Sequence, residues 1–183
     1  MSFSMALEVE AAETIATKVH EFQTDKAGRA YIDHPRRVVA NLVSHPDFAE
    51  LTSSEQSATT AAAWLHDVVE DSGTNGHPHV SLDDLSKAGI SPLAIRIIER
   101  MTRPEDKSSE LQNAYYIAIA NDPLAQLCKW ADIADNLNEQ RLAALPEALQ
   151  LKARAKYAHA LKLMPMNAIQ KEWLNARIQI AVD

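Results

Sequence analysis

A chain of 183 residues, 46% hydrophobic and 23% charged, is long enough to bury a core as one domain, or as one domain with a helical extension. The net charge of −7 provides no basic field, which argues against nucleic acid as a partner. The single cysteine, Cys128, excludes an intrachain disulfide framework and a cysteine-rich zinc site, and it fits a reducing compartment. The sequence has no apolar run of about 18 residues and no basic leader, so we expect no membrane span, no signal peptide and a cytoplasmic location.

The first part of the chain carries apolar residues at helical spacing. Residues 7–22 repeat them every three or four positions, which predicts a helix. After the loop TDKAGRAYID, the pair His34-Pro35 opens a second predicted helix, because proline suits the first helical turn. The capping box TSSE at residues 52–55 predicts a third helix that runs to about residue 70.

The remaining segments show the same period. Helices are expected at 81–87, 91–101, 111–119 and 122–137, followed by two more after Pro146 that separate near Pro165. The tyrosines and isoleucine at 115–117 leave a strand open as an alternative. No alternating pattern is long enough to build a sheet. The sequence therefore predicts an all-α fold with short loops.

The stretch AAAWLHDVVEDSG, residues 61–73, places four titratable side chains at the end of an apolar helix. Positions four apart share a helix face, so His66 is expected to stack with Glu70, and Asp67 with Asp71. Such groups beside a core need a partner, and a divalent cation would satisfy them. The alternative is a solvated acidic helix end, and this segment alone does not separate the two.

Two other segments carry matching side chains. His34, in AYIDHPRRVV, stands at a loop-to-helix junction from which it can point into a cleft, although a histidine before proline is more commonly a cap or a surface residue. In LCKWADIADNLN, Lys129, Asp132 and Asn136 share one side of a helix. Lys129 and Asp132 could also form a simple ion pair within the helix. Asp135 is expected to point outward and stays open as an alternative ligand.

These segments form the pattern H…HD…D, which resembles the HD superfamily of metal-dependent phosphohydrolases, an all-α helical bundle. Three blocks resemble the RelA/SpoT-type alarmone hydrolases in particular. YIDHPRRVV is similar to their Y-I-x-H-P-x-x-V-A segment, AAAWLHDVVEDSG to A-A-x-L-H-D-x-V-E-D-T, and LCKWADIADNL to V-K-x-A-D-x-x-x-N-L. The blocks cover roughly residues 15–140 of an expected single domain at 1–183, in which about 146–183 form a C-terminal helical extension.

The resemblance implies four metal ligands: His34, His66, Asp67 and Asp132. Two imidazoles and two carboxylates form a mixed nitrogen and oxygen site, which suits manganese, iron, cobalt or zinc rather than calcium. We expect one divalent ion, with Mn²⁺ as the first choice. A cation in such an incomplete protein cage can activate a water molecule near neutral pH.

The resemblance also implies roles for residues around the metal. Glu70 and Asp71 match the pair that positions or activates water, and Glu70 is placed to accept its proton. Asn136 matches a residue near the nucleotide, and Lys26 a basic residue that contacts its phosphates. The reaction implied is removal of the 3′-pyrophosphate of (p)ppGpp. A nucleotidase or other phosphomonoesterase of the superfamily, and a non-catalytic nucleotide-sensing HD module, are the alternatives.

Other polar residues receive less specific expectations. Whether the histidines of NGHPHV, His77 and His79, contribute to the site is open, although the segment reads as an exposed turn. His20 and His45 are expected on the surface or on a helix face. The basic residues of the last third are expected to form a solvated face: Lys152, Arg154 and Lys156. Apolar residues on the two last helices could close the core or form a homodimer interface.

A further pair of cations stands in the loop MTRPEDKSS. Arg103 and Lys107 could reach a phosphate from there, although a solvated loop is the simpler interpretation.

Overall fold

The computed structural model describes residues 3–73, 78–106 and 108–180. Apart from one isolated bridge between Thr24 and Ala30, these residues form only helices and loops, so the all-α prediction is confirmed. None of the described helices is both long and apolar enough to span a bilayer. The helices are α1 (Phe3–Val19), α2 (Asp33–Val43), the 3-10 helix η1 (Pro46–Glu50), α3 (Ser53–Leu65), α4 (Val68–Asp71), α5 (Leu82–Lys87), α6 (Pro92–Met101), α7 (Ser109–Ala120), α8 (Pro123–Asn136), α9 (Glu139–Ala143), α10 (Glu147–Leu163) and α11 (Ala168–Ile178).

Side-chain caps determine where several helices begin. The Thr52 hydroxyl accepts a hydrogen bond from the Glu55 amide, and the Glu55 carboxylate accepts one from the Thr52 amide, as the capping box before α3 predicts. Asp122 caps α8, and Pro123 occupies its first turn. These groups satisfy backbone donors that a helix start leaves unpaired.

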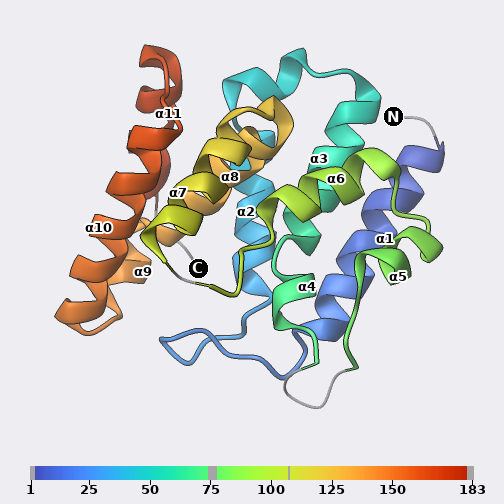
Figure 1. The fold of residues 1–183 in the computed structure, drawn as a ribbon, viewed down its shortest axis with the longest axis horizontal. Helices are drawn as coiled ribbons and strands as arrows, with labels where there is room; N and C mark the ends of the chain where they lie inside the picture. Colours follow the sequence, from blue (N-terminus) through green and yellow to red (C-terminus); the bar gives the residue numbers. More distant parts are fainter. Residues whose placement is uncertain (1–2, 74–77, 107, 181–183) are drawn as a thin grey trace.

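Helix α3 lies at the centre of the bundle. Its residues 57–65 are all buried, and four alanines between residues 58 and 63 allow neighbouring helices to approach closely. Helices α1, α2, α6 and α8 pack around it. Figure 1 shows α10 and α11 on the far side of α7 and α8 from α1, so the last third of the chain covers one flank of the bundle.

The third helix is shorter than predicted. It ends at Leu65, and a separate short helix, α4, begins at Val68. The His66 ring bonds through Nδ1 to the carbonyl oxygen of Ala63 at 2.9 Å, which is the acceptor that the next helical amide would use. The break separates His66 from the turn that carries Glu70, whereas Asp67 and Asp71 share the turn of α4, in which the Asp71 amide donates to the Asp67 carbonyl at 2.9 Å.

Helices α7 and α9 also bear on the predictions from sequence. Residues 115–117 lie within α7, which excludes the alternative strand there. The Tyr115 hydroxyl donates to the carbonyl of Met101 at 2.7 Å, so this tyrosine ties α7 to the end of α6. Helix α9 was not predicted, because five residues are too few to show an apolar period.

Helix α11 is attached to the bundle by stacked rings. The His45 ring lies between Trp130 and Trp173, with centroid distances of 5.7 and 4.4 Å, and the Trp173 indole donates to the Ser44 hydroxyl at 3.1 Å. His45 is 2% exposed, so the expectation that it lies on the surface is wrong. Burial lowers the pKa of His45, which keeps its ring neutral among the tryptophans. We propose on this basis that residues 1–183 unfold as one unit.

Replacement of Trp173 by alanine tests this proposal. Trp173→Ala removes a buried aromatic and is expected to lower the free energy of unfolding by about 3 kcal/mol, with a single urea transition. The control on the same helix is Ile169→Ala, an exposed position where a change of less than about 0.5 kcal/mol is expected. If Trp173→Ala leaves the main transition unchanged and adds a separate early one, α10 and α11 form an independent unit.

Candidate active site

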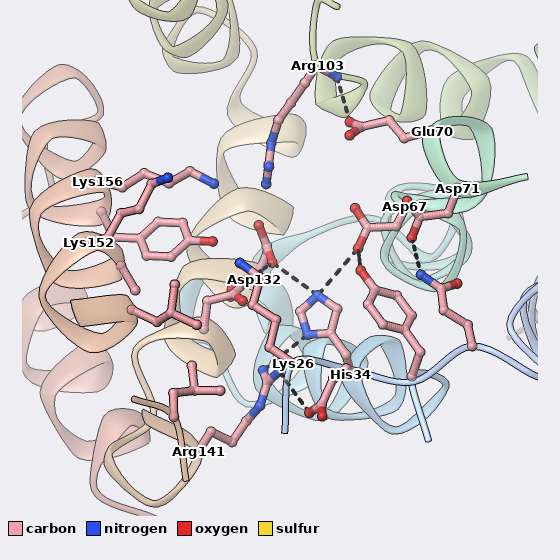
Figure 2. A pocket seen from close by; sticks show the side chains of 18 of the residues that line it. Lys26, His34, Asp67, Glu70, Asp71, Arg103, Asp132, Arg141, Lys152 and Lys156 are labelled. Atoms are coloured by element: carbon pink, nitrogen blue, oxygen red, sulfur yellow. Dashed lines mark hydrogen bonds and ion pairs between the residues drawn. The ribbon is translucent and has the colours of Figure 1, made fainter. Parts of the chain in front are cut away.

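Four titratable side chains from three parts of the chain meet in the interior. His34 comes from the start of α2, His66 and Asp67 from the break between α3 and α4, and Asp132 from the middle of α8. His34 Nε2 lies 3.3 Å from Asp132 Oδ1 and 3.5 Å from Asp67 Oδ2. His66 Nε2 lies 3.1 Å from Asp67 Oδ2 and 3.8 Å from Asp132 Oδ1. Figure 2 shows the two aspartates on either side of the His34 ring.

The chemistry of this group fits a divalent cation. Potential ligand atoms of His34, His66 and Asp132 all lie within 4.8 Å of one another, and all three residues are buried. The buried Nε2 of His66 has no hydrogen-bond partner among the described residues. Two imidazole nitrogens and the Asp132 carboxylate therefore lie close enough to share one ion, and Asp67 Oδ2 lies 3.5 and 3.1 Å from the same nitrogens of His34 and His66, as a mixed nitrogen and oxygen metal site requires.

Mutual charge favours the ionised forms of the four groups. Burial by itself would lower the pKa of His34, but hydrogen bonds to Asp132, Asp135 and Asp67 raise it well above its usual range. Burial likewise opposes charge on the two aspartates, yet the neighbouring histidines and Lys129 hold the pKa of Asp67 and of Asp132 well below the ordinary carboxyl value. A cation bound at this point would take over the role of the histidine protons.

Asp135 fixes the orientation of the His34 ring. Its Oδ2 lies 2.6 Å from His34 Nδ1, and its Oδ1 accepts a hydrogen bond from Arg37 Nε at 2.7 Å. Arg141 also donates to this carboxylate. Asp135 is 2% exposed, so the expectation that it points outward is wrong: α2 and α9 cover the side of α8 on which it lies. It faces the nitrogen of His34 that points away from the cluster, which is the usual arrangement behind a metal-binding histidine.

Both aspartates of the cluster are also held by neutral or cationic donors. The Tyr31 hydroxyl donates to Asp67 Oδ2 at 2.5 Å, and burial with the charge of Asp67 raises the Tyr31 pKa, so the phenol keeps its proton. Lys129 Nζ lies 2.7 Å from Asp132 Oδ2. Asn136 Nδ2 donates to Asp132 Oδ1 at 2.5 Å. The ion pair considered for Lys129 and Asp132 is therefore present, and it coexists with the histidine contacts of Asp132.

Glu70 and Asp71, the predicted catalytic pair, have different environments. Glu70 is exposed, its Oε1 accepts a hydrogen bond from the backbone amide of Arg103 at 2.6 Å, and desolvation of its carboxyl group raises the Glu70 pKa. Asp71 Oδ2 accepts from Gln23 Nε2 at 2.8 Å, and Gln23 Oε1 lies 2.7 Å from His20 Nδ1. In Figure 2, Asp71 lies beside Asp67, whereas Glu70 points toward Arg103.

His20 belongs to the interior and not to the surface. It is 1% exposed, and its ring centroid lies 4.9 Å from that of Tyr31. The surface expectation for His20 is therefore wrong. The series of hydrogen bonds from His20 through Gln23 to Asp71 was not predicted, because a histidine and a glutamine three residues apart form no distinctive sequence pattern.

A pocket of about 1290 Å³ opens over the cluster. Its walls come from residues 23–31, α4, residues 102–105, α7, α8, α9 and α10. Lys26 and Asn136, the residues predicted to bind substrate, both line it, together with Glu70 and Asp71. His79 lines its edge, with Nδ1 3.4 Å from the Ser72 hydroxyl, while His77 lies outside the described residues.

The last third of the chain contributes directly to this pocket. Lys152 and Lys156 of α10 line it, as does Arg103, whereas Arg154 is exposed and pairs with Glu139 at 2.6 Å. The expected solvated face is therefore right for Arg154 and wrong for Lys156, which is half-buried. Helical period places Lys152 and Lys156 on one face of α10, but only the packing of α10 against α7 shows that this face meets the pocket. Lys107 lies outside the described residues.

Comparison with known proteins agrees with this arrangement. A family model described as the HD domain matches residues 31–137. A solved structure described as a metazoan ortholog of SpoT that hydrolyzes ppGpp and plays a role in starvation responses has a TM-score of 0.71 to this chain, at 22% sequence identity over 93% of each chain. No curated protein matches the sequence. Because the HD model spans more than half of the chain and contains the buried cluster of His34, His66 and Asp132, the chain belongs to the HD-domain family and has the fold of the HD-domain phosphohydrolases.

Proposed function

We propose that the protein is a metal-dependent hydrolase that removes the 3′-pyrophosphate of (p)ppGpp, with GDP or GTP and pyrophosphate as products. The observation that carries this proposal is the buried histidine and aspartate cluster at the floor of a pocket whose opposite wall is cationic. A site of this kind suits a polyanionic substrate beside a bound cation. The likeness in fold to the metazoan protein that hydrolyzes ppGpp supports this choice of nucleotide.

The proposed metal ligands are His34, His66, Asp67 and Asp132, which would hold one divalent ion, with Mn²⁺ as the first candidate. The ion, when bound, supplies a Lewis acid that activates water and offsets negative charge on the phosphoryl group. The protein's part is to hold the four ligands in place. Asp135 does this for His34, since its hydrogen bond leaves Nε2 directed into the cluster.

Glu70 is proposed to accept the proton of the attacking water. The amide of Arg103 holds its Oε1, and no hydrogen bond from the described residues engages its Oε2. A carboxylate whose pKa is raised by desolvation is a better proton acceptor near neutral pH than an ordinary one. Asp71, held by Gln23, is proposed to position the water, and Lys26 and Asn136 to contact the nucleotide.

The activity itself is the first prediction. The purified protein with Mn²⁺ is expected to release GDP and pyrophosphate from ppGpp, and a chelator is expected to abolish the reaction. A panel of nucleoside monophosphates in the same assay tests the phosphomonoesterase alternative. Orthophosphate from the panel, with ppGpp intact, would contradict the proposed substrate and keep the hydrolase chemistry. Tight ppGpp binding with no turnover would favour the non-catalytic sensing module.

The proposed base is tested by Glu70→Gln. This variant is expected to keep its fold and its affinity for Mn²⁺, while kcat falls by about 10²–10⁴-fold because the water loses its proton acceptor. Glu99→Gln makes the same change of charge at an exposed position of α6 and should leave kcat unchanged. Unaltered turnover in Glu70→Gln would remove Glu70 from the mechanism.

The orientation of His34 is tested by Asp135→Asn. Loss of the carboxylate charge weakens the contact to His34 Nδ1, so affinity for Mn²⁺ is expected to fall by about 10-fold or more in calorimetric titration. Asp83→Asn, at an exposed position paired with Lys87, is the matched control. Circular dichroism establishes that both variants are folded. Equal affinity in the two variants would mean that Asp135 does not support the metal site.

A further inference from the structure

Positive charge gathers on the pocket wall that faces the aspartates. Arg103 follows α6, and Lys152 and Lys156 stand one helical turn apart on α10. Figure 2 shows the side chains of Arg103 and Lys156 entering the pocket from different elements and ending near each other above Asp132, with Lys152 behind them. This wall lies next to the proposed metal ligands and belongs to the same pocket.

These three cations differ from Lys129 and Arg141, which have acidic partners in the site. Lys129 pairs with Asp132, and Arg141 pairs with Asp135. In the part of the chain that the structure describes, Arg103, Lys152 and Lys156 form no ion pair. The buried Nε of Arg103 also lacks a hydrogen-bond partner there. Lys152 is exposed, but Arg103 and Lys156 are partly buried, and unpaired charge in such a position is costly, so it points to a ligand that supplies the missing anion.

The environment of Lys156 shows this cost directly. Burial and the positive charges of Arg103 and Lys129 lower the pKa of Lys156 to about 8, against the attraction of Asp132. Lys26, across the pocket, adds to the repulsion. The neighbouring ring of Tyr157, whose centroid lies 4.8 Å from Lys156 Nζ, offers only a weak cation–π contact. In a protein of net charge −7, this local gathering of cations is a property of one wall of the pocket, because acidic side chains line other parts of it.

We propose that Arg103 and Lys156, with Lys152 further out on α10, form a diphosphate-binding subsite that holds the phosphate chain undergoing cleavage. Arg103 offers a planar fork of donors that suits phosphate oxygens, and the lysines offer mobile point charges. Arg103 also holds Glu70 through its backbone amide at 2.6 Å. Arg103 thus contacts the bound anion through its side chain and Glu70, the proposed proton acceptor, through its backbone. This link fixes Glu70, and the water whose proton it accepts, relative to the phosphorus atom. The identity of the ligand rests on the proposed function.

The experiment measures binding of inorganic pyrophosphate to the full-length protein by calorimetry, in the presence of a chelator so that no turnover is required. Arg103→Gln and Lys156→Gln are each expected to weaken binding by about 10-fold or more, as loss of a charge-assisted hydrogen bond requires. Arg154→Gln, on the same helix but outside the pocket, is expected to bind pyrophosphate like the unmodified protein.

The melting temperature of Lys156→Gln separates a binding role of Lys156 from a structural one. Because the Lys156 pKa is lowered to about 8 in the folded protein, the charged side chain destabilises the fold, and this cost is fully present below pH 8, so Lys156→Gln should keep or raise the melting temperature if Lys156 serves binding. If Lys156 has a structural role, the substitution should lower the melting temperature. Lys156→Arg should retain binding and should lose less affinity than the unmodified protein between pH 7 and pH 9, since arginine keeps its charge. The titration of pyrophosphate itself affects both proteins equally.

The outcomes separate this inference from the proposed function. Pyrophosphate binding that depends on Arg103 and Lys156, without hydrolysis of ppGpp, would support the subsite and refute the substrate. Hydrolysis of ppGpp with unchanged KM, and unchanged pyrophosphate affinity in Arg103→Gln and Lys156→Gln, would refute the subsite and leave the function in place. Failure of the unmodified protein to bind pyrophosphate would also overturn the subsite.

Discussion

The burial of two histidines and two aspartates at the meeting point of α2, α3 and α8 is the constraint on which the rest of the site depends. A buried charge is tolerated only when other groups compensate it. Each member of the cluster accordingly has a further partner outside it, such as Asp135 for His34 and Tyr31 for Asp67. Those partners are held in turn, as Arg37 holds Asp135. The polar interior is therefore a layered network, in which a change at the outside alters the geometry of the centre.

The same constraint explains the form of the two helices that carry the cluster. Helix α3 stops at Leu65 because the His66 ring occupies the carbonyl of Ala63, and this break brings His66 and Asp67 to one point together. Helix α8 is buried over most of its length, so its charged residues cannot turn to solvent and must find partners on every side. Its alanines leave room for α2 and α3 to approach closely enough to supply them.

Sequence periodicity predicted most of the helices, because the apolar repeat reports which face of a segment is buried. It could not predict where an element meets its neighbours. Asp135 was assigned to the outside from its angle on α8, yet that side is covered by chain from distant parts of the sequence. Lys156 was expected on a solvated face because it is one of three basic residues close together, yet it is half-buried. The convergence of His34 with Asp132 is equally invisible to spacing, since 98 positions separate them, and only the family resemblance suggested it.

Charges in the pocket fall into two classes, and the difference bears on how the site divides its tasks. Asp132 and Asp135 belong to ion pairs that the fold completes by itself, whereas Arg103 and Lys156 keep a charge that the fold leaves without an acidic partner in the described residues. An ion pair within the protein stabilises the fold. A charged side chain without such a partner can instead contribute its interaction energy to the binding of a ligand. The HD model ends at residue 137, before α10 begins, so Arg103 lies within the matched region together with the histidine and aspartate cluster, whereas Lys152 and Lys156 lie beyond it. Substitutions on α10 could therefore change which anion is held while the cluster and its supporting network stay the same.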